Sequence, residues 1–187
     1  MAAAALAAGR DPASVKLVAV TKGHPLEALE AALDAGIPDL GENRIEELEE
    51  KEAALGREWA VWHMIGHLQS RKAARAAAAA HLVHSVDSRH LAEKLSRAGE
   101  AREAEVRVLA QVNTSGEESK GGLPFPGAVE AVLGMTALPR LRVEGLMTMA
   151  PFVDDVEVLS SAFRRLRETL EEGRRHDPRA GPEPSMG

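Results

Sequence analysis

Short runs of apolar and β-branched residues alternate along this chain with longer stretches in which apolar residues recur at helical spacing. Such alternation is typical of repeated βα units, in which helices cover a parallel sheet. Pro25 follows the first run and predicts a helix through Ala35 that ends at Gly36, because proline suits the first turn and glycine follows the last. Strands are expected at residues 16–21, near Leu40, and at 59–65, 82–86, 105–112 and 141–148. Further helices are expected from Asn43, from Ser70, after Asp87 or Ser88 as cap, from Pro126 and from Asp154.

The pattern favours a (β/α)₈ barrel that lacks its eighth unit. A seventh strand is expected near Pro184, and no further unit follows it. A closed barrel of this kind typically takes about 250 residues, and this chain has 187. An open doubly wound sheet would show the same alternation. The barrel is preferred because the unusual polar residues fall just after predicted strands, where barrel loops build binding sites.

Composition restricts the class of protein. With 44% apolar and 28% charged residues, residues 1–187 fit a single globular domain. The net charge of −6 gives no electrostatic basis for binding nucleic acid. The absence of cysteine excludes disulfides, thiolate metal sites and a cysteine nucleophile, and fits a reducing compartment. No apolar run approaches the roughly 20 residues of a membrane span, and no signal peptide is evident, so we expect a cytoplasmic protein without a membrane partner.

Lys22 ends the first predicted strand. A lysine at that place can turn its ammonium group into the mouth of a barrel, where loss of water favours the neutral amine that attacks an aldehyde. On position alone, a lysine that extends to water is the commoner case, and the neighbouring motifs favour the functional one. Asn43, in Gly41-Glu42-Asn43 after the second strand, is expected to cap the next helix and to point its amide at a bound group, although such triplets are usually simple turns.

The histidines do not predict a metal site. His63 and His67 are four residues apart, which on a strand is about 13 Å, too far for one ion. His63 is therefore expected to be packed or hydrogen-bonded, and His67 to lie in a loop. His81 and His84 have an odd separation and would point to opposite faces of a strand.

Three further segments follow predicted strands. The polar loop at residues 113–122 contains Lys120, which fits either an exposed loop or a secondary contact to a cofactor. Met149 follows the sixth strand and is expected to be core filler. Ser185-Met186-Gly187 lies at the end of the seventh strand, where barrels often bind phosphate. No dinucleotide fingerprint or P-loop is present.

Seven motifs in this order and at consistent spacing resemble the pyridoxal phosphate homeostasis family, which is similar to the N-terminal barrel of alanine racemase. The motifs are Lys-Leu-Val-Ala-Val-Thr-Lys, Gly-Glu-Asn, Trp-His-Met-Ile-Gly-His-Leu-Gln-Ser-Arg-Lys, His-Ser-Val-Asp-Ser, Gln-Val-Asn-Thr-Ser, Gly-Leu-Met-Thr-Met and Ser-Met-Gly. They extend from about Val15 to the last residue.

The resemblance implies that pyridoxal 5′-phosphate is the cofactor and that Lys22 holds it as a Schiff base. It places Asn43 near the cofactor ring or its linker, Ser185 and Gly187 in the phosphate cup, and Lys120 where a lysine influences occupancy. Met147, in the Gly-Leu-Met-Thr-Met motif, is also implied at the cofactor site. The family continues past Ser-Met-Gly into groups that help to hold the phosphate, so we expect this chain to bind weakly.

The implied function is a monomeric carrier of pyridoxal phosphate that supplies dependent client enzymes and has no catalytic residues. A racemase needs an acid and a base on opposite faces of its substrate, which racemases of the resembled kind obtain from a tyrosine and a second domain; this sequence has no tyrosine. A Schiff-base aldolase would use the lysine without a cofactor. An inactive fragment that packs against another chain is a further alternative.

Overall fold

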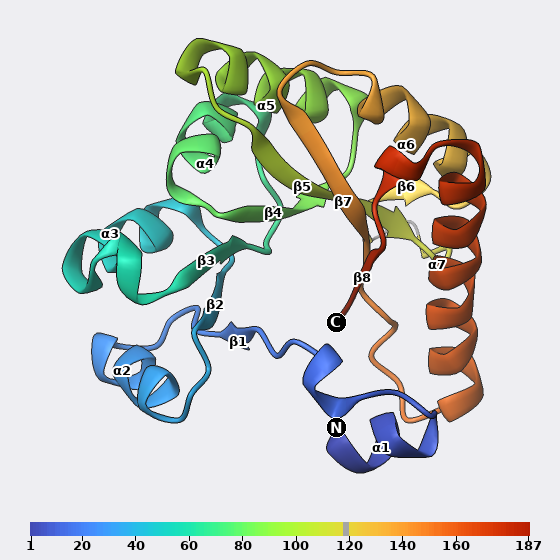
Figure 1. Ribbon diagram of the computed structural model, residues 1–187, viewed down its shortest axis with the longest axis horizontal. Coiled ribbons are helices and arrows are strands. Elements are labelled where there is room, and N and C mark those ends of the chain that lie inside the picture. The colour runs from blue at the N-terminus through green and yellow to red at the C-terminus, as the bar shows by residue number, and fades with distance from the viewer. Residues whose placement is uncertain (118–119) are drawn as a thin grey trace.

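The computed structural model describes residues 1–117 and 120–187, and its centre is a curled, parallel β-sheet. The strands follow the order β1-β2-β3-β4-β5-β7-β8, and the short β6 pairs with β5 beside this path. Figure 1 shows the sheet curving from β1 round to β8 with the helices outside it. Within the described residues β1 and β8 are not paired with each other. The predicted α/β architecture of the barrel kind is confirmed, as a curled parallel sheet with helices outside it.

The elements alternate as the sequence pattern predicts. The strands are β1 (Ala19–Val20), β2 (Asp39–Glu42), β3 (Val61–Met64), β4 (Leu82–Val86), β5 (Val106–Asn113), β6 (Leu123–Pro124), β7 (Leu141–Thr148) and β8 (Glu183–Met186). The α-helices are α1 (Ala2–Ala7), α2 (Leu26–Asp34), α3 (Ile45–Leu55), α4 (Ala73–Ala79), α5 (Arg89–Arg102), α6 (Ala128–Thr136) and α7 (Val156–His176). Single 3₁₀ turns are η1 (Pro12–Ser14), η2 (Arg57–Trp59), η3 (Ser70–Lys72) and η4 (Pro178–Ala180).

The structure corrects several expected boundaries. The first strand is only Ala19–Val20, since these are the residues that pair with β2. Helix α3 begins at Ile45 with Arg44 as its N-cap, so Asn43 does not cap it. The helix expected from Ser70 begins with a 3₁₀ turn before α4. Strand β6 was not expected, because two residues are too few to give a period of two.

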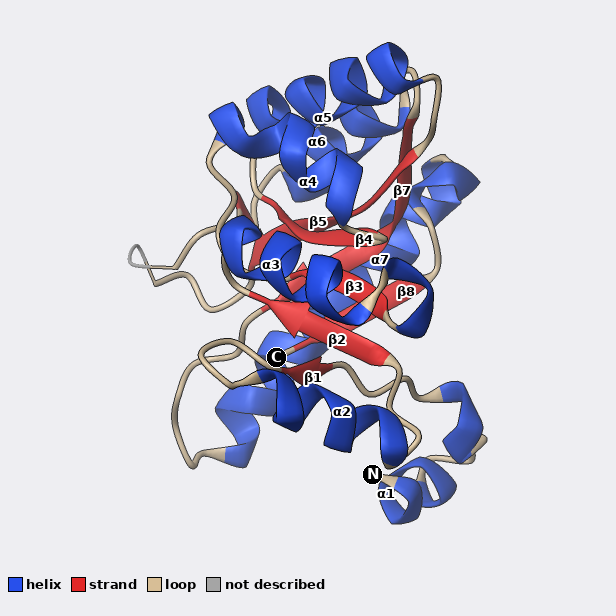
Figure 2. Ribbon diagram, turned by 90° about the vertical axis from the view of Figure 1, so that its left-hand side faces the viewer, coloured by secondary structure: helices blue, strands red, loops and turns tan. Residues whose placement is uncertain are grey.

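The hydrophobic core lies between the outside of the sheet and the surrounding helices, and Figure 2 shows this layering from the side. Strand β5 illustrates the cause. Val106, Val108, Ala110 and Val112 all belong to the core, whereas Arg107 between the first two is exposed. Successive side chains on a strand point to opposite faces, so one face of β5 packs against helices and the other lines the inside of the curled sheet.

The pairing of β7 with β8 depends on a very close backbone approach at Gly145. This glycine has φ 155° and lies opposite Glu183 in the register. A Cβ at this position would overlap the backbone of Glu183. Glycine is therefore required for β8, and with it Ser185, to lie beside β7.

None of the helices formed by the described residues combines the length and the apolar character needed to cross a bilayer.

Candidate functional site

Lys22 lies at the carboxyl end of β1, two residues after the last paired residue Val20. Its side chain is exposed and lies on the rim of a cavity of about 530 Å³. The cavity wall also includes Asn43 after β2, and Gly66 and His67 after β3. The carboxyl ends of three adjacent strands thus bring a free amine, an amide and an imidazole together. A cavity of this size is in the range of sites for small molecules.

The backbone before Lys22 is fixed by a buried carboxylate on the neighbouring strand. Glu42 is fully buried at the end of β2, and its Oε1 accepts hydrogen bonds from Thr21 Oγ1 at 2.6 Å and from Lys51 Nζ at 2.6 Å. Lys51 Nζ also donates to the Thr21 carbonyl at 2.7 Å. A buried charge that is paired and hydrogen-bonded in this way holds its partners in one geometry. From sequence alone Glu42 is expected only as part of a turn, since nothing in the pattern links it to Lys51 on α3.

Asn43 and Gly66 are packed backbone to backbone in the cavity wall. A Cβ on Gly66 would lie 2.6 Å from Asn43 Cα and would also overlap the Asn43 carbonyl oxygen. Next to this contact, His67 Nδ1 lies 3.2 Å from Asp87 Oδ2, which follows β4. His67 is exposed, as expected for a loop residue. The wall that faces Lys22 is therefore set by the close approach of the loops after β2 and β3.

A row of polar side chains crosses the inside of the curled sheet. We call Asp39, His63, His84 and Ser185 the histidine row. His63 Nε2 lies 2.9 Å from Asp39 Oδ1, His63 Nδ1 lies 2.8 Å from His84 Nε2, and His84 Nδ1 lies 3.0 Å from Ser185 Oγ. The row connects β2, β3, β4 and β8, and both histidines are buried. The sequence predicted that His63 would be packed or hydrogen-bonded, and the structure shows that it is both buried and hydrogen-bonded, to partners that no local pattern indicated.

Burial keeps both histidines of the row neutral. Desolvation lowers the pKa of His84 to about 3 and also lowers that of His63, in which the hydrogen bond to Asp39 opposes the effect. Desolvation disfavours the charged imidazolium in each case. The row therefore consists of two neutral imidazoles between a carboxylate and a hydroxyl group.

These shifts predict that the protein loses stability in acid. A histidine whose pKa is lowered by folding binds its proton more readily in the unfolded chain, so stability is complete above about pH 6.5 and falls below it. For His84 the fall is on the order of 1 kcal/mol per pH unit, and His63 adds to it in the same direction. Urea unfolding at several pH values should show this fall between about pH 6.5 and 5. His90→Gln, at an exposed histidine, should keep the same slope. An unchanged free energy of unfolding across this range would contradict the burial of neutral imidazoles.

The other implied site residues gather at the ends of β7 and β8. Met147 is buried and lies in register with Ser185, and Gly187 N donates to the Thr148 carbonyl at 3.1 Å. Lys120 Nζ donates to the Ala150 carbonyl at 2.7 Å. Among the described residues that line the cavity, Lys22 and Asn43 are the two that the motifs had implied.

Two expectations for this region need comment. Met149 is 47% exposed and is not core filler, because the chain leaves the sheet after Thr148. The loop at residues 113–122 includes Glu118 and Ser119, which lie outside the described residues.

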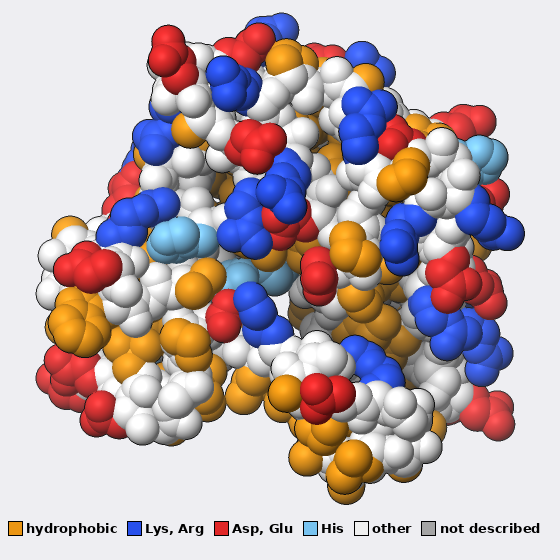
Figure 3. Space-filling model, viewed as in Figure 1, with side chains coloured by type: hydrophobic (Ala, Val, Ile, Leu, Met, Phe, Trp, Pro, Cys, Tyr) orange, Lys and Arg blue, Asp and Glu red, His pale blue; other side chains and the backbone are white. Residues whose placement is uncertain are grey.

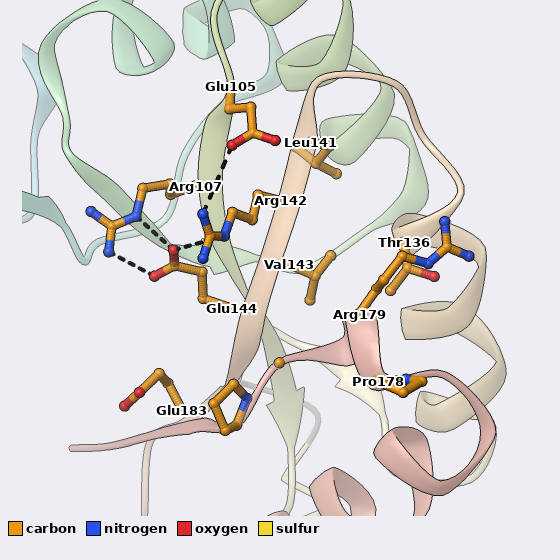
Figure 4. Close-up of a pocket in the computed structure, with 12 residues that line it drawn as sticks. Glu105, Arg107, Thr136, Leu141, Arg142, Val143, Glu144, Pro178, Arg179 and Glu183 are labelled. Atoms are coloured by element: carbon orange, nitrogen blue, oxygen red, sulfur yellow. Dashed lines mark hydrogen bonds and ion pairs between the residues drawn. The ribbon is translucent and has the colours of Figure 1, made fainter.

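A second cavity, of about 620 Å³, lies at the amino ends of β5, β7 and β8. Figure 4 shows Arg107 and Arg142 beside Glu144: Arg107 Nε donates to Glu144 Oε1 at 2.6 Å, and Arg142 lies 3.4 Å from the same carboxylate. Arg179, the third arginine of this cavity, is paired with Asp177 at 2.8 Å. Figure 3 shows basic and acidic side chains side by side around the centre of this face. Because the positive charge is paired, this cavity offers little attraction for an anion, and we assign it no function.

Within residues 1–117 and 120–187 no group of three or more His, Asp or Glu side chains is placed to hold a metal ion. The two buried histidines instead bond to each other.

Comparisons with known proteins agree with this arrangement. The family model described as alanine racemase, N-terminal domain, matches residues 4–186. The pyridoxal phosphate homeostasis protein of Pseudomonas aeruginosa is 42% identical over 170 residues, which is 89% of this chain and 73% of that protein. The homologue from Aquifex aeolicus, described in the same words, is 34% identical over 180 residues, covering 96% of this chain and 79% of that protein.

A solved structure shows the same architecture with and without a ligand. PipY of Synechococcus elongatus PCC7942 without PLP superposes with a TM-score of 0.88 at 32% identity, covering 100% of this chain and 89% of that one. The PipY structure with PLP bound gives a TM-score of 0.84 and covers 99% of this chain and 86% of that one. The match over nearly all of the sequence, together with a lysine at the end of the first strand, shows that this chain belongs to the pyridoxal phosphate homeostasis proteins of the alanine racemase N-terminal domain family.

Proposed function

We propose that this protein binds pyridoxal 5′-phosphate on Lys22 and serves to hold and release the cofactor in the cell without turning over a substrate. The observation that carries the proposal is the position of Lys22, an exposed amine at the mouth of the curled sheet and on the rim of a cavity for a small molecule. When bound, the cofactor supplies an aldehyde that condenses with a lysine amine to give a Schiff base and water.

The chain's own residues fit this group in three ways. Lys22 is accessible to an aldehyde, and the Glu42 network fixes the backbone from which it extends. The close contact of Gly66 with Asn43 leaves a wall without side-chain bulk at that point. Ser185 presents a hydroxyl group at the end of β8, the place where barrels commonly hold a phosphate.

The proposed roles follow from these positions. Lys22 is the attachment point, Asn43 orients the ring, and the Ser185 hydroxyl group contacts the phosphate. The Gly187 N–H joins that contact by turning from the Thr148 carbonyl, to which it donates in the free protein. Met147 lies beside Ser185 on the neighbouring strand β7, and Lys120 links the segments after β5 and β7 through its bond to Ala150. We further propose that the protein acts as a monomer in the cytoplasm and passes the cofactor to enzymes that depend on it.

Titration with pyridoxal 5′-phosphate tests the proposal directly. A yellow adduct of one cofactor per chain is expected. Lys72, the second lysine of the cavity wall, is paired with Glu46 at 3.0 Å, which leaves the exposed Lys22 as the accessible amine. Pyridoxine 5′-phosphate, which has no aldehyde, should compete for the site without giving colour. A colour change that pyridoxine 5′-phosphate does not suppress would show adventitious reaction with surface lysines and would count against a built site.

Gly66→Ala is expected to weaken binding of pyridoxal 5′-phosphate about tenfold or more, roughly 1.4 kcal/mol. The new methyl group would overlap Asn43 and would have to push the loop after β2 away from the cavity wall. Absorbance titration measures the affinity. Gly134→Ala in α6, where the new Cβ meets only the end of the Arg89 side chain at 3.4 Å, is the matched control and should bind as the unaltered protein does. Equal affinities of the two variants would remove Asn43 from the site.

A further inference from the structure

In the histidine row, the donor and the acceptor of each hydrogen bond can be assigned. A carboxylate only accepts hydrogen bonds, so His63 Nε2 donates to Asp39. Because His63 is neutral, its Nδ1 is an acceptor, and His84 Nε2 must donate to it. Neutral His84 then accepts at Nδ1, so the Ser185 hydroxyl group donates its only hydrogen to His84. Every hydrogen in the row points toward Asp39.

A phosphate dianion bound at Ser185 would change the direction of the hydrogen bond at that end of the row. All its exposed oxygens are acceptors, so Ser185 can contact it only by donating its hydrogen to the phosphate. His84 Nδ1 then loses its donor inside the protein, and leaving a buried acceptor unpaired costs about 1–3 kcal/mol. The loss is avoided if His84 carries its hydrogen on Nδ1 and donates it to Ser185 Oγ.

Reversing the hydrogen bond between His84 and Ser185 forces each further hydrogen bond of the row to reverse as well, up to the Asp39 carboxylate. With its hydrogen on Nδ1, His84 accepts at Nε2 and needs His63 to donate from Nδ1. His63 would then turn an unprotonated Nε2 to Asp39 Oδ1 across 2.9 Å, which places two acceptors against each other. One additional proton between His63 and Asp39 restores a hydrogen bond at every step.

Resting on the proposed function, we infer that contact between Ser185 and the cofactor phosphate is coupled to the uptake of one proton by the histidine row. The linkage has a defined sign: because the bound state holds one more proton than the free state, affinity falls as pH rises, by up to about tenfold per pH unit. The row thus makes the affinity for the phosphate group depend on pH.

The charged groups around the row allow a proton to reach it from outside. Asp39 Oδ1 lies 3.2 Å from Lys16 Nζ, and the Lys16 side chain is 62% exposed. Arg107 on β5 also acts on His63, but its charge is paired with Glu144 of β7. Asp39 begins β2, whereas Ser185 lies near the end of β8. The proton can therefore enter at the opposite end of the sheet from the one where the phosphate binds.

Calorimetry tests the inference through the number of protons taken up on binding. Pyridoxal 5′-phosphate and 5-deoxypyridoxal are compared at about pH 7.5, where the phosphate is already a dianion, in buffers of different ionisation enthalpy. Both ligands carry an open aldehyde, whereas pyridoxal itself closes to a hemiacetal, so their difference isolates the phosphate. About one additional proton is expected with pyridoxal 5′-phosphate, and no difference would overturn the inference.

The variant Asp39→Asn tests whether the proton is taken up by the row or by another group. An asparagine amide can either accept from His63 Nε2 or donate to it, so this row can reverse without a proton. The variant should bind pyridoxal 5′-phosphate with no additional uptake and with an affinity that no longer falls at alkaline pH. Asp34→Asn, at an exposed residue of α2, should keep the uptake of the unaltered protein. Full uptake in Asp39→Asn would place the proton on the phosphate and overturn the inference.

Nitrogen NMR of the histidines gives a readout that does not depend on Lys22. In the free protein both His63 and His84 should carry hydrogen on Nε2, and inorganic phosphate at high concentration should move hydrogen to Nδ1 of both. Unchanged signals with phosphate contradict the coupling even if the yellow adduct forms normally. Absence of the adduct with a normal response to phosphate contradicts attachment at Lys22 and leaves the coupling supported.

Discussion

Replacing Lys22 with alanine is expected to abolish the yellow adduct and to weaken binding of pyridoxal 5′-phosphate on the order of a hundredfold, roughly 3 kcal/mol. The variant loses the nucleophile that forms the covalent bond, while the contacts proposed for the phosphate and the ring remain. Absorbance after addition of the cofactor measures the adduct, and calorimetry measures the remaining affinity. The melting temperature should hardly change, because the Lys22 side chain is exposed.

Two further variants define what this result means. Lys94→Ala removes an exposed lysine of α5 and should leave the adduct intact. Lys22→Arg keeps a positive charge but offers no amine that condenses with an aldehyde, so it should lose the adduct as alanine does. Retention of a stoichiometric adduct in either Lys22 variant would show that a different lysine is the attachment point.

Gly145→Ala is expected to destabilise the protein by about 3 kcal/mol or more, the sum of an unfavourable φ and a backbone overlap. The overlap is with Glu183, and it can be relieved only by separating β8 from β7. For a chain of this length such a loss lowers the melting temperature by about 6 °C or more. Because Ser185 moves with β8, affinity for pyridoxal 5′-phosphate should fall more than affinity for pyridoxal.

Gly173→Ala is the matched control for this stability measurement. It lies within α7, where a Cβ would meet Ala180 Cβ at an ordinary distance of 3.6 Å. Replacing a helical glycine with alanine typically stabilises by about 0.5–1 kcal/mol. A Gly145→Ala variant that melts as the Gly173→Ala variant does would contradict the close approach of β7 and β8.

Much of the fold can be predicted from the sequence because its strands have strong local signals. Strands β4 and β7 have the boundaries that their apolar runs predict, and Pro25 marks the start of α2. The first strand is shorter than expected, since pairing with β2 and not composition sets its length. Boundaries of this kind depend on the neighbouring strand, which a single run of sequence does not contain.

The candidate site likewise has residues that the sequence can indicate and contacts that only the fold determines. Lys22 is a candidate from sequence because it ends a predicted strand, where the functional residues of barrels gather. Position alone does not decide its role, and the resemblance of the neighbouring motifs favours it. The bond between His84 and Ser185 joins residues 101 positions apart, and the partnership of Glu42 with Lys51 depends on how α3 packs on β2. No local pattern encodes such contacts. The prediction that Asn43 caps the helix was wrong for a related reason. The helix begins two residues later, at Ile45, and Asn43 belongs to a loop that packs against Gly66.

Attachment at one amine is tested most directly by reducing the unaltered protein with borohydride in the presence of pyridoxal 5′-phosphate at equal concentration, then locating the label by peptide mass spectrometry. The label is expected almost entirely on the peptide that contains Lys22, at no more than one per chain. A label distributed over several lysines, or carried mainly by a lysine outside the end of β1, would contradict the assignment.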